Sequence, residues 1–511
     1  MSSNRILKYF NKNLALAFGV IAISTLNYGF DNAGYATAQA MEAFQHQFGE
    51  LDLKTGRYRL PTVWLSLFNS LNFIGFAAGV AIGSMVSHQW GRRWCMFSMS
   101  AWALIPATIA ITSSRREQIM AARVLNYIYT GMELAVVPVY QSEIMPSAIR
   151  GFSVGSYQLS LMSGTLIINC ICRGTSELSG NASWKIPLGL YYVVPTIVMV
   201  MIFKIPESPR WLLTKGRVEQ ARESLSKLGG EKLGANEIET HLSALQYALT
   251  LESEKGNYME LFKGVNIKRT AIVLGMNFFQ MATGQAFIST YGAIFIRGLG
   301  GVNPFNMTVI ISICNIVVVC VALYFNDRVG RRPLLMIGTV WQFVAIIILG
   351  SLGTISEPSS QAVKIAVVSM MTIFSTGYVF AWAPLTFVVT TEVPALRLRD
   401  ASQRTGSIVN VITNFVVSFT IPYLLYEPYA ALGSKVGFIF GGNLVLAFIF
   451  TYYCVPECKG KSLEQIDLLF NQCVPLRSFG KSPNFDQVEE SLDEQKENTG
   501  KGGVAKHEEG V

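Results

Sequence analysis

Long apolar stretches, spread over most of the chain, constrain its fold more than any other feature of the sequence. A helix needs about 20 mostly apolar residues to cross a hydrocarbon core of roughly 30 Å. Twelve stretches meet this requirement: 14–36, 62–87, 94–113, 118–140, 152–173, 184–205, 270–292, 305–325, 333–353, 364–389, 404–424 and 433–455. Only 14% of the 511 residues are charged, which leaves too little contiguous polar sequence for a catalytic domain. We therefore predict an all-α membrane protein that is not an enzyme.

The Lys and Arg residues number 41, against 33 Asp and Glu, and they are distributed unevenly along the chain. When the spans are assigned alternately, most of these cations fall on the side of the N-terminus, which predicts that both termini are cytoplasmic. Topology then explains the net charge of +8, and a nucleic-acid partner is not expected. The eight cysteines form no Cys-x-x-Cys pair and no histidine lies in a span, so neither a metal site nor a cofactor is expected.

The spans divide the chain into five segments. We expect a cytoplasmic N-terminus at 1–13, a six-helix bundle at 14–205, a cytoplasmic helical linker at 206–268, a second six-helix bundle at 269–455 and a cytoplasmic tail at 456–511. The linker is rich in Lys and Arg and contains amphipathic helical patterns. The tail is dense in Glu and Lys from about residue 475, which predicts disorder from there.

The two halves repeat one another. Three pairs of landmarks recur after about 240 to 250 residues: Gly91-Arg92-Arg93 with Gly330-Arg331-Arg332, Glu143 and Arg150 with Glu392 and Arg399, and Pro206-Glu207 with Pro456-Glu457. Two related six-helix halves are typical of a transporter that binds its substrate between them, near the middle of the bilayer.

At these residues the chain resembles the sugar porter family of the major facilitator superfamily, from Asn27 to about Phe470. The motifs that carry the resemblance are 206–213, 327–332, 456–464 and 143–151, and the stretch 132–138 is most similar to fungal members. The resemblance implies twelve transmembrane helices in two pseudo-symmetric bundles that move a sugar or a similar polyhydroxylated molecule by alternating access. We expect a monomer in the plasma membrane.

The charged residues of the repeated motifs are predicted to form a cytoplasmic gate, because Arg and carboxylate side chains at helix ends can form ion pairs across the two halves. The alternative is that the arginines only set the topology. One departure from the family weakens the gate in the first half, where Ser87 and His88 replace its Asp-Arg. The predicted gate residues are Arg92, Arg93, Glu143, Arg150, Glu207, Arg210, Asp327, Arg331, Arg332, Glu392, Arg399 and Glu457.

Ionisable residues inside the spans are candidates for proton coupling, because such groups are costly in lipid. Asp31 and Arg123 lie on antiparallel spans, each roughly 8 Å from the external end of its helix, so they share a depth. Asp31 could alternate between pairing with Arg123 and isolation, and so carry a proton; a permanent ion pair is the alternative. In the resemblance, proton-coupled sugar porters have Asp at this position. Glu133 is either a second proton site or a carboxylate satisfied by a neighbouring helix.

A hydroxyl-rich substrate needs neutral hydrogen-bonding groups and an aromatic surface. Candidates in the spans are Gln158, Gln280, Gln285, Asn315, Asn410 and Asn414, together with Phe387. Such amides can instead join neighbouring helices. In the resemblance, Gln158, Gln280, Asn315 and Asn410 match sugar-contacting positions, whereas Met281, Ala286, Phe387 and Val411 replace more polar or larger family residues. The substrate is therefore predicted less firmly than the fold: it is a standard hexose or a less polar polyol, hydroxyacid or secondary metabolite.

Two other functions on the same scaffold remain open: an exporter of a small secondary metabolite or hydroxyacid, and a nutrient sensor that does not transport. An ATP-driven pump is disfavoured, because neither Gly-Lys-Ser sequence, at 460–462 or at 480–482, has the leading glycine of a phosphate loop. Asn181 and Asn306 begin sequons for N-glycosylation on the predicted external side.

Overall fold

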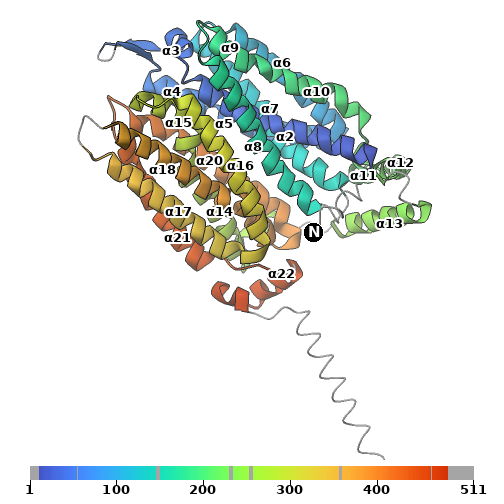
Figure 1. Ribbon diagram of the computed structural model, residues 1–511. Coiled ribbons are helices and arrows are strands. Elements are labelled where there is room, and N and C mark those ends of the chain that lie inside the picture. Colours follow the sequence, from blue (N-terminus) through green and yellow to red (C-terminus); the bar gives the residue numbers. More distant parts are fainter. Residues whose placement is uncertain are drawn as a thin grey trace, which may run out of the picture.

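A computed structural model describes residues 11–53, 56–145, 150–229, 234–252, 257–355, 360–461 and 463–481. The chain is almost entirely helical, and its long helices run side by side in two groups (Figure 1). A short hairpin of β1 (Glu50–Asp52) and β2 (Arg57–Arg59) lies at one end of the helices, and α11 (Pro209–Thr214), α12 (Val218–Gly229) and α13 (Ala235–Glu252) lie at the other. We call these ends the hairpin side and the linker side.

The first half is built from helices that cross between these two sides. They are α2 (Lys12–Ala38), α4 (Thr62–Ser70) with α5 (Asn72–Trp90), α6 (Arg92–Thr112), α7 (Arg116–Ile144), α8 (Arg150–Thr175), and α9 (Ala182–Gly189) with η2 (Leu190–Tyr192) and α10 (Val193–Met201). The short α3 (Glu42–Phe48) leads from α2 into the hairpin.

The second half repeats this arrangement. Its helices are α14 (Asn266–Ala282) with α15 (Gln285–Leu299), α16 (Pro304–Val329), α17 (Arg331–Leu352), α18 (Gln361–Phe380) with α19 (Trp382–Glu392), α20 (Arg399–Leu425) and α21 (Val436–Cys454). Ten helical segments in the described ranges are long and apolar enough to cross a membrane, and α7 and α8 correspond to the remaining two predicted spans.

The chain beyond the last span is packed further than the sequence suggests. The helix α22 (Leu463–Asn471) and the 3-10 helix η8 (Leu476–Lys481) lie against the linker side of the second half. The Phe479 ring is fully buried and contacts Phe470 edge to face, with 5.0 Å between the ring centroids. Disorder from about residue 475 is therefore wrong for 476–481, because an aromatic anchor fixes this segment; residues 482–511 lie outside the described chain.

Glycines allow the closest helix contacts in the first half. A Cβ atom at Gly29 of α2 would lie 1.9 Å from the backbone oxygen of Leu161, and one at Gly164 of α8 would lie 1.9 Å from that of Leu26. Gly79 of α5 approaches the backbone of α7 in the same way, at Ile128. In membranes the hydrophobic effect does not drive helices together, so small residues that let the backbones approach closely promote such packing. These contacts fix the rotation of α2 and α7, and thus the face that each turns to the interior.

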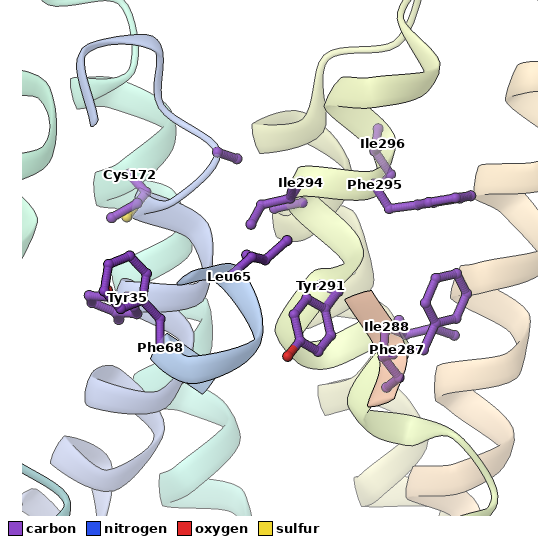
Figure 2. Packing of buried hydrophobic residues seen from close by; sticks show 14 of the residues in the cluster. Tyr35, Leu65, Phe68, Cys172, Phe287, Ile288, Tyr291, Ile294, Phe295 and Ile296 are labelled. Carbon is purple, nitrogen blue, oxygen red and sulfur yellow. The ribbon is translucent and has the colours of Figure 1, made fainter. Parts of the chain in front are cut away.

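The two halves are joined at the hairpin side. One cluster of buried apolar side chains there draws on both halves, and in Figure 2 Leu65 of α4 points toward Tyr291 and Ile294 of α15. Polar contacts cross the same boundary: Asn169 Nδ2 donates to Ser312 Oγ over 2.9 Å, and Arg297 donates to the backbone oxygen of Ala40.

On the linker side, by contrast, the buried apolar clusters stay within one half each. One draws on α2, α6, α7 and α10, and the other on α14, α17, α19 and α21 together with α22 and η8. The described conformation is thus closed between the halves at the hairpin side.

Candidate functional site

Asp31 and Arg123 lie in the interior of the first half. Asp31 of α2 is 2% exposed and Arg123 of α7 is 5% exposed. Asn27 Nδ2 donates to Asp31 Oδ2 over 3.2 Å, and the neutral amide of Asn126 lies nearby. The Tyr191 hydroxyl donates to the backbone oxygen of Asp31 over 3.0 Å. The carboxyl group is therefore held by a neutral donor.

Arg123 is adjacent to Asp31 but does not pair with it directly in this conformation. The two side chains interact electrostatically, yet the described residues include no Asp31–Arg123 contact within the 4.0 Å of an ion pair. The guanidinium carbon instead lies 3.8 Å from the centroid of the Tyr35 ring and 4.9 Å from that of Tyr127. Cation–π contacts with two tyrosines therefore hold the charge of Arg123 beside Asp31.

Glu133 lies on the same helix as Arg123, nearer the linker side. Its side chain is fully buried, and neither carboxyl oxygen has a hydrogen-bond partner in the part of the chain that the structure describes. The nearby groups with which it interacts include Asp31 and the Tyr129 hydroxyl. The alternative that a neighbouring helix satisfies Glu133 finds no support in these contacts.

The amides of the second half form two connected groups. Asn410 Nδ2 of α20 donates to Gln280 Oε1 of α14 over 2.9 Å, and Gln280 Nε2 donates to the backbone oxygen of Trp382 in α19 over 3.5 Å. Asn315 Nδ2 of α16 donates to Ser375 Oγ of α18 over 3.1 Å, and Gln285 Nε2 of α15 donates to the same oxygen over 3.4 Å. Gln280 and Asn410 thus bind each other, and Gln285 and Asn315 meet at Ser375 of α18.

The other predicted substrate residues stand apart from these groups. Asn414 Oδ1 accepts a hydrogen bond from Ser418 of its own helix. Gln158 of α8 is half-buried in the first half. Phe387 is 57% exposed, whereas the nearby Trp382 is fully buried and donates from Nε1 to Thr339 Oγ1 over 3.0 Å. Phe387 therefore has a free ring face, whereas the Trp382 ring is held in the core.

Sequence reasoning missed Ser375 and several tyrosines that accompany these residues. Tyr28 of α2 interacts with Tyr378 across the two halves, which brings the Gln280 group close to the interior of the first half. Ser24, Asn27 and Asp31 recur at intervals of three and four residues, which places them on one face of α2. This spacing was the signal in the sequence for a polar face, since single polar residues in spans are otherwise common.

The repeated loop motifs build the same device in each half. In the first half, Arg92 forms a two-bond ion pair with Glu143, both bonds being 2.8 Å. Glu207 accepts the backbone N–H groups of Arg92 and Arg93, over 3.0 and 3.1 Å, at the start of α6. A carboxylate at this place caps the helix and complements its dipole.

In the second half Arg331 forms bonds of 2.9 and 3.3 Å with Glu392. Glu457 accepts the backbone N–H groups of Arg331 and Arg332, each over 3.1 Å. The turn before each capped helix is a glycine with positive φ, 95° at Gly91 and 109° at Gly330, which only glycine adopts freely.

These ion pairs differ from the expected gate in one respect. We expected pairs that cross between the halves, whereas Arg92–Glu143 joins α6 to α7 and Arg331–Glu392 joins α17 to α19, each inside one half. The reason is local: the short glycine turn places the arginine directly beside the end of the neighbouring helix of the same bundle. These pairs therefore brace each half at the linker side.

Burial raises the pKa of Glu207 above its ordinary value, against the backbone donors of Ser208, Arg93 and Arg92, which lower it. Replacement of the family residues by Ser87 and His88 leaves backbone contacts in place: Arg92 donates to the Ser87 oxygen and Trp211 Nε1 to that of His88.

Fewer contacts are described for the other predicted gate residues. Arg210 is the second residue of the short helix α11, three positions after Glu207. Arg399 begins α20, and its Nε and Nη2 atoms are buried without a hydrogen-bond partner among the described residues. The side chains of Arg150 and Asp327 lie outside the described part of the structure.

Both sequon residues are exposed at the hairpin side. Asn181 Oδ1 accepts a hydrogen bond from Trp184 Nε1 over 3.2 Å. Asn306 lies in the first turn of α16, and its Oδ1 accepts a hydrogen bond from Arg173 of α8 in the other half. The oxygen of Asn306 thus takes part in the contact between the halves.

Comparison with known proteins gives a consistent result. Residues 17–470 match the family model described as "Sugar (and other) transporter". MFS transporter fmqE of Aspergillus fumigatus is 27% identical over 466 residues, which cover 89% of this chain and 85% of the relative. The low-affinity glucose transporter HXT1 of Saccharomyces cerevisiae is 27% identical over 494 residues, covering 92% and 85%. The high glucose sensor RGT2 of the same yeast is 28% identical over 421 residues, covering 80% and 55%.

Solved structures show the same fold. The inward open conformation of the xylose transporter XylE from E. coli has a TM-score of 0.73 at 20% identity and covers 89% of this chain and 99% of its own. The proton:xylose symporter XylE bound to 6-bromo-6-deoxy-D-glucose has a TM-score of 0.69 at 21% identity, covering 90% and 99%. These likenesses confirm the predicted all-α membrane fold with two six-helix bundles.

Proposed function

Because the chain belongs to the sugar transporter family of the major facilitator superfamily, we propose that it moves a sugar or a similar polyhydroxylated molecule across a membrane together with protons. The single observation that carries the proposal is the burial of Asp31 beside Arg123, in a bundle that faces the amide groups of the other half. An ionisable pair in a membrane interior costs free energy, and such residues usually mark a functional site. The chain is an integral membrane protein, and its relatives include transporters and a sensor.

We place the linker side in the cytosol, because most Lys and Arg of the connecting segments lie there. Both termini are then cytoplasmic, and the described conformation, closed at the hairpin side, is the inward-facing one. We take the membrane to be the plasma membrane and the working unit to be a monomer. The other state would follow from rocking the two halves about the substrate site.

Asp31 carries the proton in this scheme. In the described conformation the neutral Asn27 donates to its carboxyl group, and Arg123 is held by Tyr35 and Tyr127 instead of pairing with it. A shift of one side chain would form the ion pair and favour the charged carboxylate, whereas the separated arrangement favours the proton-bound form. Alternation between the two arrangements couples the proton to the movement of the halves.

The amide groups bind the substrate. The Asn410–Gln280 pair and the Asn315–Ser375–Gln285 group supply donors and acceptors. Sugar hydroxyls can bind these groups by replacing their present partners. The exposed Phe387 ring supplies an apolar face. Since Met281 and Ala286 add no amide and Val411 no ring, we expect the preferred substrate to carry fewer hydroxyl groups than a hexose, or to be more apolar.

The loop ion pairs keep each half rigid as it moves. Two-bond contacts between Arg and a carboxylate fix orientation as well as position, and the pairs Arg92–Glu143 and Arg331–Glu392 join neighbouring helices at the cytoplasmic end of each half. We propose that these braces form the inner gate surfaces that meet when the cytoplasmic side closes. Asn181 and Asn306 are proposed external glycosylation sites.

Two alternatives follow from the relatives, which include a named sensor and transporters whose names give no substrate, at similar identity. In the first the protein exports a small metabolite, and in the second it senses a nutrient without transporting it. Uptake into a transporter-deficient cell separates a sensor from a transporter. Vesicles with an imposed pH gradient of either sign separate import from export.

The test of the proposal is uptake of a panel of radiolabelled sugars, polyols and hydroxyacids into proteoliposomes, with and without a protonophore. We expect one class to accumulate against its gradient only while the pH gradient persists. Asp31→Asn should abolish this accumulation and retain exchange of labelled for unlabelled substrate. Undiminished accumulation by Asp31→Asn would contradict the role of Asp31, and the absence of any transported compound would contradict transport itself.

A further inference from the structure

Glu133 is a buried acid for which the transport scheme above has no use. Its side chain is fully buried and, within the described ranges, neither of its oxygens receives a hydrogen bond. An ionised carboxylate in such a place costs several kcal/mol. Buried polar groups in native proteins are almost always satisfied, so each exception calls for a reason. A role in which the group gains and loses a proton supplies that reason.

A row of buried polar side chains connects Asp31 with Glu133. On α2, Ser24, Asn27 and Asp31 recur every three or four residues, and on α7 Tyr129 and Glu133 do so in the opposite direction. Residues at this spacing share one face of a helix. The row begins at Asp31 and approaches the linker side, where Glu133 lies about 15 Å beyond Arg123 along α7.

One hydrogen bond and several electrostatic interactions link the members of this row. Asn27 donates to Asp31, and the Tyr129 hydroxyl lies next to Asn27 and Ser24 and interacts with both carboxyl groups. Several atoms of the row are buried without a hydrogen-bond partner among the described residues. They are Ser24 Oγ, Asn27 Oδ1, Asp31 Oδ1, the Tyr129 hydroxyl and both Glu133 oxygens. The row thus offers free donor and acceptor capacity from one acid to the other, which a proton path requires.

The inner end of the row reaches the substrate groups. Glu133 interacts with Tyr157 of α8, the neighbour in sequence of Gln158, and with Tyr28 of α2. Tyr28 in turn interacts electrostatically with Tyr378, which lies near Gln280. Glu133 therefore lies where both the proton and the substrate site can affect it.

We propose that Glu133 is a second proton-binding site that receives the proton from Asp31, a step that rests on the proposed proton coupling. Side-chain rotation first brings the Tyr129 hydroxyl within hydrogen-bond reach of both acids, which the described conformation keeps apart. The O–H bond at Asp31 Oδ1 then breaks as the proton passes to the Tyr129 hydroxyl, and the original Tyr129 proton forms a new O–H bond on the ionised Glu133. Asp31 is left as a carboxylate beside Arg123, Tyr129 is unchanged, and Glu133 is neutral. Glu133 then releases the proton to water on the linker side.

Charge in the surroundings of Glu133 favours this order. The titratable groups that interact with it are Asp31 and Tyr28 from α2, Tyr129 from its own helix and Tyr157 from α8. The opposite face of α7 meets glycines of α5. Asp31 is the carboxylic acid of this set, whereas the other three groups are tyrosines, which ordinarily stay neutral near neutral pH. Once Asp31 has passed on its proton, its negative charge disfavours a second charge on Glu133 and holds the proton there until it is released.

The experiment compares wild-type protein with Glu133→Gln and Tyr129→Phe in proteoliposomes that contain a trapped pH dye. Proton entry and uptake of the best substrate of the panel are recorded over a range of external pH, with exchange measured in parallel. We expect Glu133→Gln to lose proton-driven accumulation at least tenfold and its pH dependence with it, while exchange persists. Tyr129→Phe, which keeps the ring and removes the hydroxyl, should slow proton entry about tenfold.

Gln342→Leu is the matched control, because Gln342 is likewise fully buried with both amide atoms unpartnered in the described residues, but lies on α17 in the other half. It should leave proton entry within twofold of wild type. Coupled transport by Glu133→Gln at the wild-type rate and pH profile would overturn the relay. If that variant does not fold, the same result for Tyr129→Phe would overturn it. Either result would leave proton symport through Asp31 standing. Absence of coupled proton entry in the wild type would instead overturn the proposed function.

Discussion

Opening of the hairpin side should become easier when the contact between Asn169 and Ser312 is removed. Ser312 Oγ accepts a hydrogen bond of 2.9 Å from Asn169 Nδ2, which joins α8 of the first half to α16 of the second. Ser312→Ala removes the acceptor without adding bulk. A net contribution of about 0.5 to 1.5 kcal/mol for one such bond corresponds to a roughly 2- to 13-fold larger population of the open state.

The assay measures the rate at which a membrane-impermeant maleimide labels a cysteine introduced at Leu65. This residue is 2% exposed within the apolar cluster between the halves (Figure 2), so it is labelled only when the hairpin side opens. Mass spectrometry of the peptide that contains the new cysteine distinguishes it from the eight native ones. When opening is rapid and rare, the labelling rate is proportional to the open population, and Ser312→Ala should raise it by the factor given above.

Ser369→Ala is the control. Ser369 Oγ donates to the backbone oxygen of Ile365 over 2.9 Å within α18, so its loss removes a comparable bond that does not cross the halves. Labelling in this variant should match that of the parent. An unchanged rate in Ser312→Ala, or an equal increase in both variants, would refute the reasoning that contacts across the hairpin side determine this equilibrium.

Three further changes test the packing and the loop motifs. Arg331→Ala breaks a two-bond, partly buried pair with Glu392 and should cost about 2 kcal/mol in the free energy of unfolding, with Arg331→Lys recovering only part; thermal unfolding in detergent checks this. Gly164→Leu places carbon against the Leu26 backbone, 1.9 Å away for Cβ alone, and should abolish recovery of monodisperse protein in size-exclusion chromatography. Burial raises the pKa of Glu207, so the stability that this carboxyl group contributes increases as pH falls from the raised pKa toward the ordinary one. Glu207→Gln should remove that part of the pH dependence of the melting temperature. An unaltered pH profile in this variant would contradict the prediction.

Much of the fold was accessible from the sequence. The spans follow from length and apolar content because lipid offers no hydrogen bonds to the backbone, which leaves helices as the available solution. The two halves followed from repeated landmarks, and both copies of the Gly-Arg-Arg motif do begin a helix, α6 and α17. Residues 476–481 were expected to be disordered and form a 3-10 helix instead, since composition did not reveal that Phe479 packs into the core.

The candidate site was only partly accessible. Asp31, Arg123 and Glu133 stood out singly, because any charge in a span does. Their partners did not: Tyr35 beneath Arg123 and Tyr129 beside Glu133 look like ordinary aromatic residues of a membrane helix in the sequence. The ion pairs of the loops were expected between the halves and lie within them.

The amino-acid sequence by itself determined how many helices cross the membrane, where they begin and end, and which of them carry charge, since each of these properties depends on the neighbours of a residue along the chain. The tertiary structure alone decided that Asp31 and Glu133 belong to one polar row, that Gln285 and Asn315 meet at Ser375, and that the hairpin side is closed. The physical reason is that these contacts depend on the rotation of each helix about its axis. Backbone contacts such as that between Gly29 and Leu161 set this rotation, and they join residues more than a hundred positions apart.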